Sequence, residues 1–338
     1  MLRLDSAAPH AGRKGEARSL AKPALIAAAA VTLALTNAVC AESLAQPSDD
    51  SLQRRAAGYI AFREDVAAIE AKPFTSAEVT REAHRRLSTH DARALSSGWV
   101  AYAALVAADT PSFRDAIGDE IKGAKFNGLK GRDALFAQMA QDPYYVRRLK
   151  GVQEAVDKVM AMTAADAARF SALGEAFKAQ AYAMQKTKWG VAKLSPPPAR
   201  LEDADAYGAS RGATSSDLPA TTDKGVTQPM LANASGAWSP DWGKSSPGRV
   251  NGENAEVIMT RVLNLAARYS ADGMNGKLVD VYAKNDRSDS CLSMARLTLR
   301  QCIAATRAPY EEAFCIGEHA LNDVSACLGW VASAGGGS

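Results

Sequence analysis

Apolar side chains recur at helical spacing through most of residues 48–190. The first stretch places them three, four and seven positions apart, at Leu52, Ala56, Tyr59, Ile60, Val66 and Ile69. This spacing is typical of the buried face of an amphipathic helix. We find no run with the two-residue alternation of a half-buried strand. The pattern therefore predicts an all-α fold, a helical array or bundle, with one helical domain over residues 48–190.

Local signals predict where several of these helices begin. Thr75 and Glu78 fit a capping box, in which a hydroxyl and the carboxylate three residues later bind free backbone amides. Further helix starts are expected near Asp91, Pro111, Arg132, Asp142 and Thr163.

Residues 195–252 differ in composition from what precedes them. They contain seven of the fourteen prolines in the chain and seven glycines. Such a segment loses much chain entropy on folding and buries little apolar surface, so we expect a linker or a loop draped over the helices. Within it, Trp238, Pro240 and Trp242 form an apolar group that is costly to leave in water. We expect this group to dock, either on the helices of this chain or on a partner protein.

Helical patterning resumes over residues 253–332. Residues 291–306 and 310–330 each read as an amphipathic helix, and Pro309 lies in the short connection between them. We therefore expect a C-terminal helical hairpin. Four of the five cysteines lie in this hairpin, at Cys291, Cys302, Cys315 and Cys327.

The cysteine positions favour a nested pairing, Cys302 with Cys315 and Cys291 with Cys327. Across an antiparallel helix pair, facing residues have a nearly constant sum of residue numbers, and the nested pairs share that sum while crossed pairs do not. Pairing within each helix would join residues about 16 Å apart, beyond the reach of a disulfide. One misfit remains, because twelve helical residues place Cys327 about 120° around from Cys315. That end of the hairpin therefore needs a bend or a frayed turn.

The N-terminus resembles a secretory signal. Basic residues up to Lys22 precede an uncharged apolar stretch at 24–36, and small residues lead up to Ala41. The order of basic, apolar and small residues predicts a signal peptide over residues 1–41, cleaved after Ala41. A lipoprotein signal acylated at Cys40 fits less well. We expect a periplasmic or secreted protein with no transmembrane span after cleavage, and its even number of clustered cysteines also favours export.

Charge and composition set limits on the partners. The net charge is +3, and residues 1–41 carry five basic and two acidic side chains, so the remainder is neutral overall. A neutral mature chain argues against a nucleic-acid surface. Its 47% hydrophobic content is enough for a substantial core.

Motifs for chemistry are few. Gly208, Ser210 and Gly212 match a nucleophile-elbow pattern but lack the preceding core strand that this chemistry needs. Asp203 and Asp205 begin like a calcium loop, whose later ligand positions are missing. The four clustered cysteines are spaced unlike those of a zinc site, and we expect no metal or cofactor.

His84 and His90 lie six residues apart, unlike a pair of metal ligands on one helix, and a helix end between them is expected. We interpret them as surface or interhelical side chains.

Two functional hypotheses follow. The first is a non-enzymatic interaction or adaptor protein of a bacterial-type cell envelope that binds another envelope protein. The alternative is a hydrolase of the cell wall or of a periplasmic small molecule, with carboxylates in a helical cleft. An exposed apolar groove without titratable groups would favour the first, and a deep pocket with a buried carboxylate the second.

Overall fold

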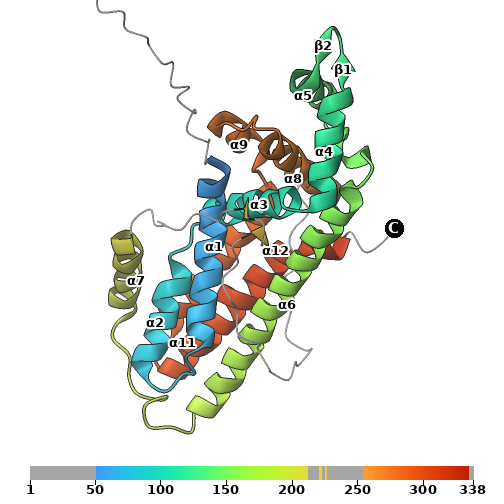
Figure 1. The fold of residues 1–338 in the computed structure, drawn as a ribbon. Helices are drawn as coiled ribbons and strands as arrows, with labels where there is room; N and C mark the ends of the chain where they lie inside the picture. The colour runs from blue at the N-terminus through green and yellow to red at the C-terminus, as the bar shows by residue number, and fades with distance from the viewer. Residues whose placement is uncertain (1–50, 212–220, 223–224, 227–253, 335–338) are drawn as a thin grey trace, which may run out of the picture. The chain divides into compact units, whose positions relative to one another are not determined.

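The computed structural model describes residues 51–211, 221–222, 225–226 and 254–334, and helices dominate it (Figure 1). The elements are α1 (Ser51–Glu70), α2 (Ala77–Ser88), α3 (Ala92–Ala108), α4 (Pro111–Gly123), β1 (Lys125–Phe126), β2 (Leu129–Lys130), α5 (Gly131–Gln141), the 3₁₀ helix η1 (Val146–Arg148), α6 (Val152–Met184), α7 (Pro197–Arg211), β3 (Thr221–Thr222), β4 (Gly225–Val226), α8 (Ala255–Ser270), α9 (Gly276–Tyr282), α10 (Asp286–Ala305), α11 (Pro309–Cys315), the π-helix η2 (Ile316–Asn322) and α12 (Asp323–Ala334). The strands form two short antiparallel pairs, β1 with β2 and β3 with β4. The expected all-α fold is confirmed.

Helix α3 is the centre of the core. Fifteen of its 17 residues are buried, and it contacts α1, α8, α10, α6 and α4. Its sequence is almost entirely alanine and other apolar or small residues, so no face is suited to water. Asp91 caps its first turn, accepting a hydrogen bond from the Ala94 amide at 2.9 Å.

Two glycines allow α1 and α3 to cross closely. A Cβ atom added to Gly58 would lie 2.9 Å from the Ala94 carbonyl oxygen, and one added to Gly98 would lie 2.7 Å from the Tyr59 amide nitrogen. Both distances are shorter than real Cβ contacts, so the backbones can approach this closely only because no side chain intervenes. The crossing places Tyr59 and Trp99 inside the protein.

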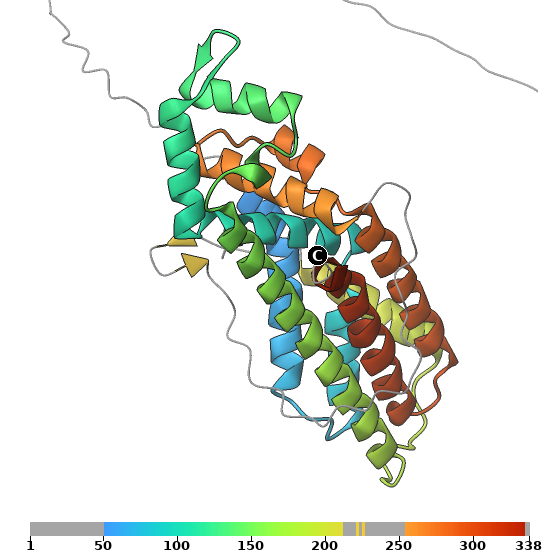
Figure 2. The same cartoon turned by 90° about the vertical axis from the view of Figure 1, so that its right-hand side faces the viewer.

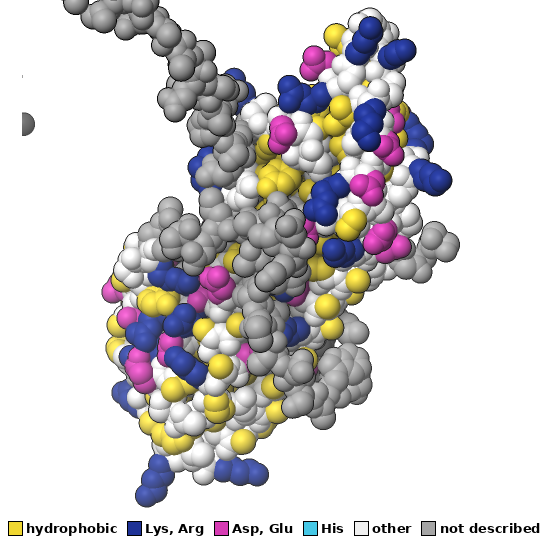
Figure 3. Space-filling model, viewed as in Figure 1, with side chains coloured by type: hydrophobic (Ala, Val, Ile, Leu, Met, Phe, Trp, Pro, Cys, Tyr) yellow, Lys and Arg dark blue, Asp and Glu magenta, His cyan; other side chains and the backbone are white. Residues whose placement is uncertain are grey.

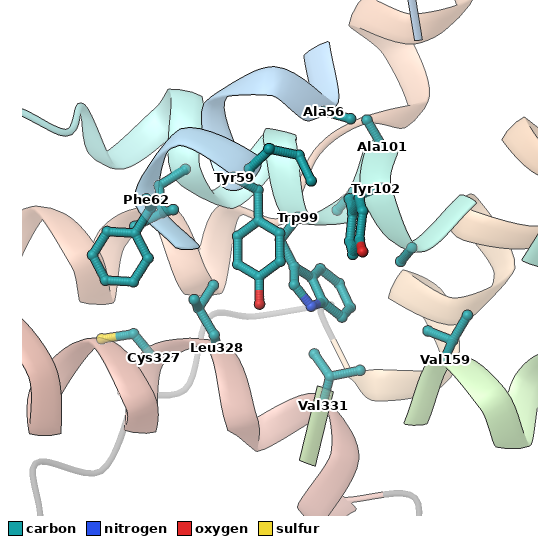
Figure 4. Packing of buried hydrophobic residues seen from close by; sticks show 14 of the residues in the cluster. Ala56, Tyr59, Phe62, Trp99, Ala101, Tyr102, Val159, Cys327, Leu328 and Val331 are labelled. Carbon is teal, nitrogen blue, oxygen red and sulfur yellow. The ribbon is translucent and has the colours of Figure 1, made fainter. Parts of the chain in front are cut away.

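The interior between these helices is aromatic on one side and aliphatic on the other. Figure 4 shows Tyr59, Trp99 and Tyr102 pointing from α1 and α3 toward Leu328 and Val331 of α12. All five side chains are at most 2% exposed. The C-terminal hairpin is therefore part of the same core as α1 and α3.

The longest helix, α6, runs alongside α11, η2 and α12 (Figure 2). It continues unbroken through Thr163, where a helix start was expected, and the buried hydroxyl of Thr163 bonds to the Val159 carbonyl oxygen. The expected start near Asp142 is also wrong, because a turn and the short η1 follow there.

The starts predicted at Asp91 and Pro111 are confirmed, and α5 begins at Gly131, beside the predicted Arg132. Helix α2 is capped by Ser76 rather than by Thr75.

The C-terminal hairpin is closed by the two predicted disulfides. Cys291 pairs with Cys327 and Cys302 with Cys315, with Cα–Cα distances of 5.4 and 5.8 Å. The expected bend is the π-helix η2, which lies between Cys315 and Cys327. A π turn closes i→i+5 hydrogen bonds and advances roughly 80° per residue instead of 100°, so seven such residues lag by roughly 140°. That lag brings Cys327 back to the face occupied by Cys315.

The range expected to be a linker begins as a helix. Residues 197–211 form α7, which packs on α2 and α10. The preceding chain is also tied down, because the Leu194 amide bonds to the Arg307 carbonyl oxygen at 3.0 Å. The proposed docking residues Trp238, Pro240 and Trp242, the signal-peptide range and Cys40 lie outside the described residues. In the described part of the chain, no helix combines the length and apolar character needed to cross a membrane.

Candidate functional site

A groove of about 670 Å³ lies in the described part of the protein. Its walls come from α1, the turn between α2 and α3, the start of α3, the end of α7 and the start of α9. We call it the α1–α7 groove. Arg55 and Asp280 form an ion pair on its rim, and Asp91, His90 and Arg211 also line it, so both signs of charge are present.

Asp65 lies behind this groove and joins three elements. It is 1% exposed, and its carboxylate accepts hydrogen bonds from Arg86 of α2 at 3.0 Å, from His90 at 2.8 Å and from Arg211 of α7. Burial alone would raise the pKa of Asp65, but the bonds from His90 and Arg211 outweigh burial and lower it. Asp65 is therefore an ionised tie between α1, α2 and α7.

A second polar network lies inside the core. Asp166 of α6 accepts a hydrogen bond from the Tyr59 hydroxyl at 2.7 Å and an ion-pair bond from Arg63 at 3.0 Å, and Arg63 also donates to Tyr102. Burial, followed by the charge of Asp166, raises the pKa of Tyr59 well above its usual value. Burial raises the pKa of Tyr102 to about 12. Both hydroxyls therefore stay protonated at neutral pH and act in structure.

A third buried pair fixes the start of α7. Arg200 and Glu312 are 1% and 0% exposed and form an ion pair. Arg200 also donates to the Thr306 carbonyl oxygen at 2.8 Å and to the Ser195 carbonyl oxygen at 2.9 Å. Burial raises the pKa of Glu312 against the effect of Arg200.

His84 lies buried on α2, which packs against α7. It is 1% exposed, and neither of its ring nitrogens has a hydrogen-bond partner among the described residues. Burial, followed by the positive charge of Arg200, lowers the pKa of His84 to about 4. The ring is therefore neutral near pH 7. Because it is enclosed, it has no access to a substrate.

The π-helix carries a cluster of charged side chains. Lys178 of α6, 3% exposed, bonds to Glu175 at 2.8 Å and to Glu318 at 2.7 Å. Asn322 donates to Glu175 at 2.7 Å. Burial lowers the pKa of Lys178, but its bonds to the two glutamates raise it overall. The cluster holds η2 against α6, and the lysine offsets one of the two carboxylate charges.

A smaller hollow, of about 320 Å³, has a different character. It lies beside the inner disulfide, Cys302–Cys315, and is bordered by Tyr182, Phe314 and Tyr310. The rings of Tyr182 and Phe314 meet edge to face with centroids 6.3 Å apart, and Tyr182 is 50% exposed. We call this feature the disulfide hollow. Its walls are mainly apolar and are fixed by a covalent bond.

The candidate residues from the sequence analysis do not come together in one site. The four cysteines form the pairs described above. Ser210 is on α7, where its hydroxyl donates to the Tyr207 carbonyl oxygen at 2.8 Å, and no elbow is formed. Asp203 and Asp205 bind arginines on α2 and α10 instead of forming a calcium loop.

His84 and His90 are interhelical, and α2 ends between them. His90 is nonetheless part of the Asp65 cluster.

Sequence reasoning missed Asp65, Asp166 and the disulfide hollow. For Asp65, the only signal in the sequence was that Arg63 and Asp65 are charged residues within the apolar pattern of α1. Charged residues in such a position are seldom buried without a partner. Their partners are up to 146 residues away, and spacing along the chain does not reveal such pairs.

Among the described residues, no three or more His, Cys, Asp or Glu side chains are grouped so as to hold a metal ion. Comparison of the chain with family models, curated proteins and solved structures found no match.

Proposed function

We propose that this protein is an exported, non-enzymatic interaction protein of the cell envelope that binds another envelope protein through the disulfide hollow. The observation that carries the proposal is the exposed aromatic surface beside a covalently fixed pair of helices. Tyr182 is half exposed, although it packs against Phe314. Large aromatic side chains near a rigid apolar hollow are typical anchors of protein interfaces.

Export is supported by the cysteine chemistry and the leader pattern. Cys291, Cys302, Cys315 and Cys327 are all disulfide-bonded, and disulfides persist in oxidising compartments such as the periplasm. The basic, apolar and small-residue order of residues 1–41 is that of a signal peptide. N-terminal sequencing of protein extracted from the envelope should find a start near Glu42. An intact Met1, or a diacylglyceryl group on Cys40, would contradict cleavage after Ala41.

The carboxylates of the α1–α7 groove favour binding over hydrolysis. Asp65, behind the groove, accepts hydrogen bonds from Arg86, His90 and Arg211, and its lowered pKa keeps it from serving as a general acid near neutral pH. Asp280 on the rim is paired with Arg55.

Site-specific photo-crosslinking tests the interface. A photoreactive residue in place of Tyr182 should form a discrete adduct with one envelope protein in intact cells. The matched control is Tyr144, a tyrosine 37% exposed in the turn after α5. If the two positions give the same adducts, or if Tyr182 gives none, the proposed interface is wrong.

A further inference from the structure

Helix α7 is held to the rest of the protein mainly by charged side chains. Of its 15 residues only Arg200 and Ala204 are buried, and Leu201 is partly buried against the core. A surface helix usually docks through a continuous apolar stripe. Figure 3 shows Lys and Arg intermixed with Asp and Glu over this side of the protein, as expected for docking by ion pairs.

The N-terminal end of α7 is a fixed anchor. Arg200 is enclosed, pairs with Glu312 and donates to two backbone carbonyl groups. Pulling it out would leave the Glu312 carboxylate buried without its cation, which is strongly unfavourable.

Beyond the buried Ala204, the C-terminal half, residues 204–211, is held by ion pairs in which at least one side chain is reached by water. Arg300 binds Asp205 through two bonds of 2.7 and 3.2 Å, but these side chains are 35% and 53% exposed. Arg211, at the end of the helix, is 26% exposed and binds Asp65, which is 1% exposed. Exposed pairs such as Arg300–Asp205 are weak and are screened by salt, and salt reaches the Arg211–Asp65 pair through its exposed arginine.

Asp65, whose carboxylate holds the end of α7, does not depend on Arg211 for a hydrogen-bond partner. If Arg211 leaves, Asp65 keeps its bonds to Arg86 and His90, so no buried charge is left without a partner. Releasing Arg211 therefore costs far less than releasing Arg200. Gly208 and Arg211 form part of the wall of the α1–α7 groove.

We infer that residues 204–211 are a hinged wall of the α1–α7 groove, anchored at Arg200 and latched by the Arg211–Asp65 pair. Release of the latch swings the wall away from α2 and widens the groove. The wall is closed at low ionic strength and opens as salt weakens the latch.

Hydrogen exchange of the full chain tests this. Between about 0.05 M and 1 M salt, amides of residues 204–211 should exchange roughly two- to fivefold faster, while those of α6 stay unchanged. Arg211→Gln should give the same increase at low salt. The matched control, Asp119→Asn, removes the exposed Lys122–Asp119 pair on α4 and should leave α7 unaffected.

A crosslink provides the second test. A Cβ atom on Gly208 would lie 3.2 Å from the Thr89 Cβ, a few tenths of an ångström closer than the disulfide range of about 3.5–4.5 Å, so a small outward shift of α7 would bring the pair into that range. The double variant Thr89→Cys/Gly208→Cys, once oxidised, should lose the salt response of residues 204–211. If exchange there is unchanged by salt and by Arg211→Gln, or if residues 197–203 loosen equally, the hinge is disproved.

Discussion

Arg63 of α1 and Asp166 of α6 form an ion pair inside the core, with 3.0 Å between Nη2 and Oδ1 and side chains 4% and 5% exposed. Tyr59 donates to the second oxygen of the carboxylate, and Tyr102 accepts a bond from Arg63. Four side chains from three helices thus bond to one another in a region that excludes water, and among the described residues only the Arg63 Nε of this network has no partner. Buried networks of this kind are stabilising only while they are complete.

Removing the Asp166 carboxylate should strongly destabilise the folded protein. Asp166→Ala leaves Arg63 charged and buried without its partner, and we expect the free energy of unfolding to fall by about 3–5 kcal/mol. Denaturant unfolding monitored by circular dichroism measures this loss. As the control, Asp119→Ala removes a carboxylate that is 77% exposed and should change stability by less than about 1 kcal/mol. Equal effects of the two substitutions would show that the core pair is dispensable.

His84 should make stability depend on pH. Its pKa is about 4 in the folded protein and near 6.5 in the unfolded chain, because burial and the positive charges of Arg200 and Arg300 outweigh the opposing charges of Asp203 and Asp205. The unfolded state therefore binds the proton more tightly. This contribution to stability is complete above about pH 6.5 and is lost as the pH falls toward 4, by up to about 1.4 kcal/mol per pH unit.

The comparison that isolates this effect uses His84→Leu, which removes the titrating group and keeps the site apolar. Between pH 7 and pH 4.5, where the paired carboxylates also lose stability, the wild type should lose more unfolding free energy than the variant. Parallel pH profiles would rule out His84 as the source.

The inner disulfide, Cys302–Cys315, should stabilise the fold and should have no redox activity. Replacing both Cys302 and Cys315 with Ala should lower the free energy of unfolding by roughly 2–5 kcal/mol, because the unfolded chain gains freedom. The helices of residues 51–184 should keep their circular dichroism signal, since they contain no cysteine. Peptide mapping comes first, because trypsin cuts at Arg307, between the helices. Fragments on either side of Arg307 that separate without a reductant would exclude both bridges.

Two helical glycines should respond in opposite directions to the same substitution. A Cβ on Gly174 would lie 2.6 Å from the Gly317 carbonyl oxygen in η2, so Gly174→Ala should cost about 1–3 kcal/mol through overpacking. Gly118 has open space around it on α4, and Gly118→Ala should stabilise by about 0.5–1 kcal/mol. Thermal unfolding of both variants is the measurement. A stabilising Gly174→Ala would show that α6 and η2 are not in close contact.

The sequence predicted those features whose cause is local or periodic. Apolar spacing predicted the helices within residues 48–190, and Asp91 and Pro111 marked two of their starts. The disulfide pairing followed from positions on two antiparallel helices. It also exposed the phase misfit at Cys327, which the structure resolves with a π-helix. The location of the π-helix was not predictable, because it depends on how Gly317 packs against α6.

What the sequence did not reveal depends on distant partners. Residues 197–211 looked like a linker because their proline-rich surroundings and exposed polar side chains mask a helix with a very narrow buried face. Its contacts are ion pairs to α1, α2, α10 and α11, and charge patterns along one segment do not identify such partners. The unbroken course of α6 past Thr163 was hidden for a related reason, since the Thr163 hydroxyl bonds within the helix and initiates nothing.

The nested disulfides also set how far the chain can be stretched. Cys291 and Cys327 are 36 residues apart, and the inner bridge lies between them. When the protein is pulled by its two ends, the force passes from Cys291 to Cys327 through the sulfur atoms, and the enclosed residues carry no load. A fully extended chain gains about 3.4 Å per residue, so reduction should lengthen the stretched protein by about 120 Å. The hairpin is thus mechanically shielded, and single-molecule extension with and without reductant would show the difference directly.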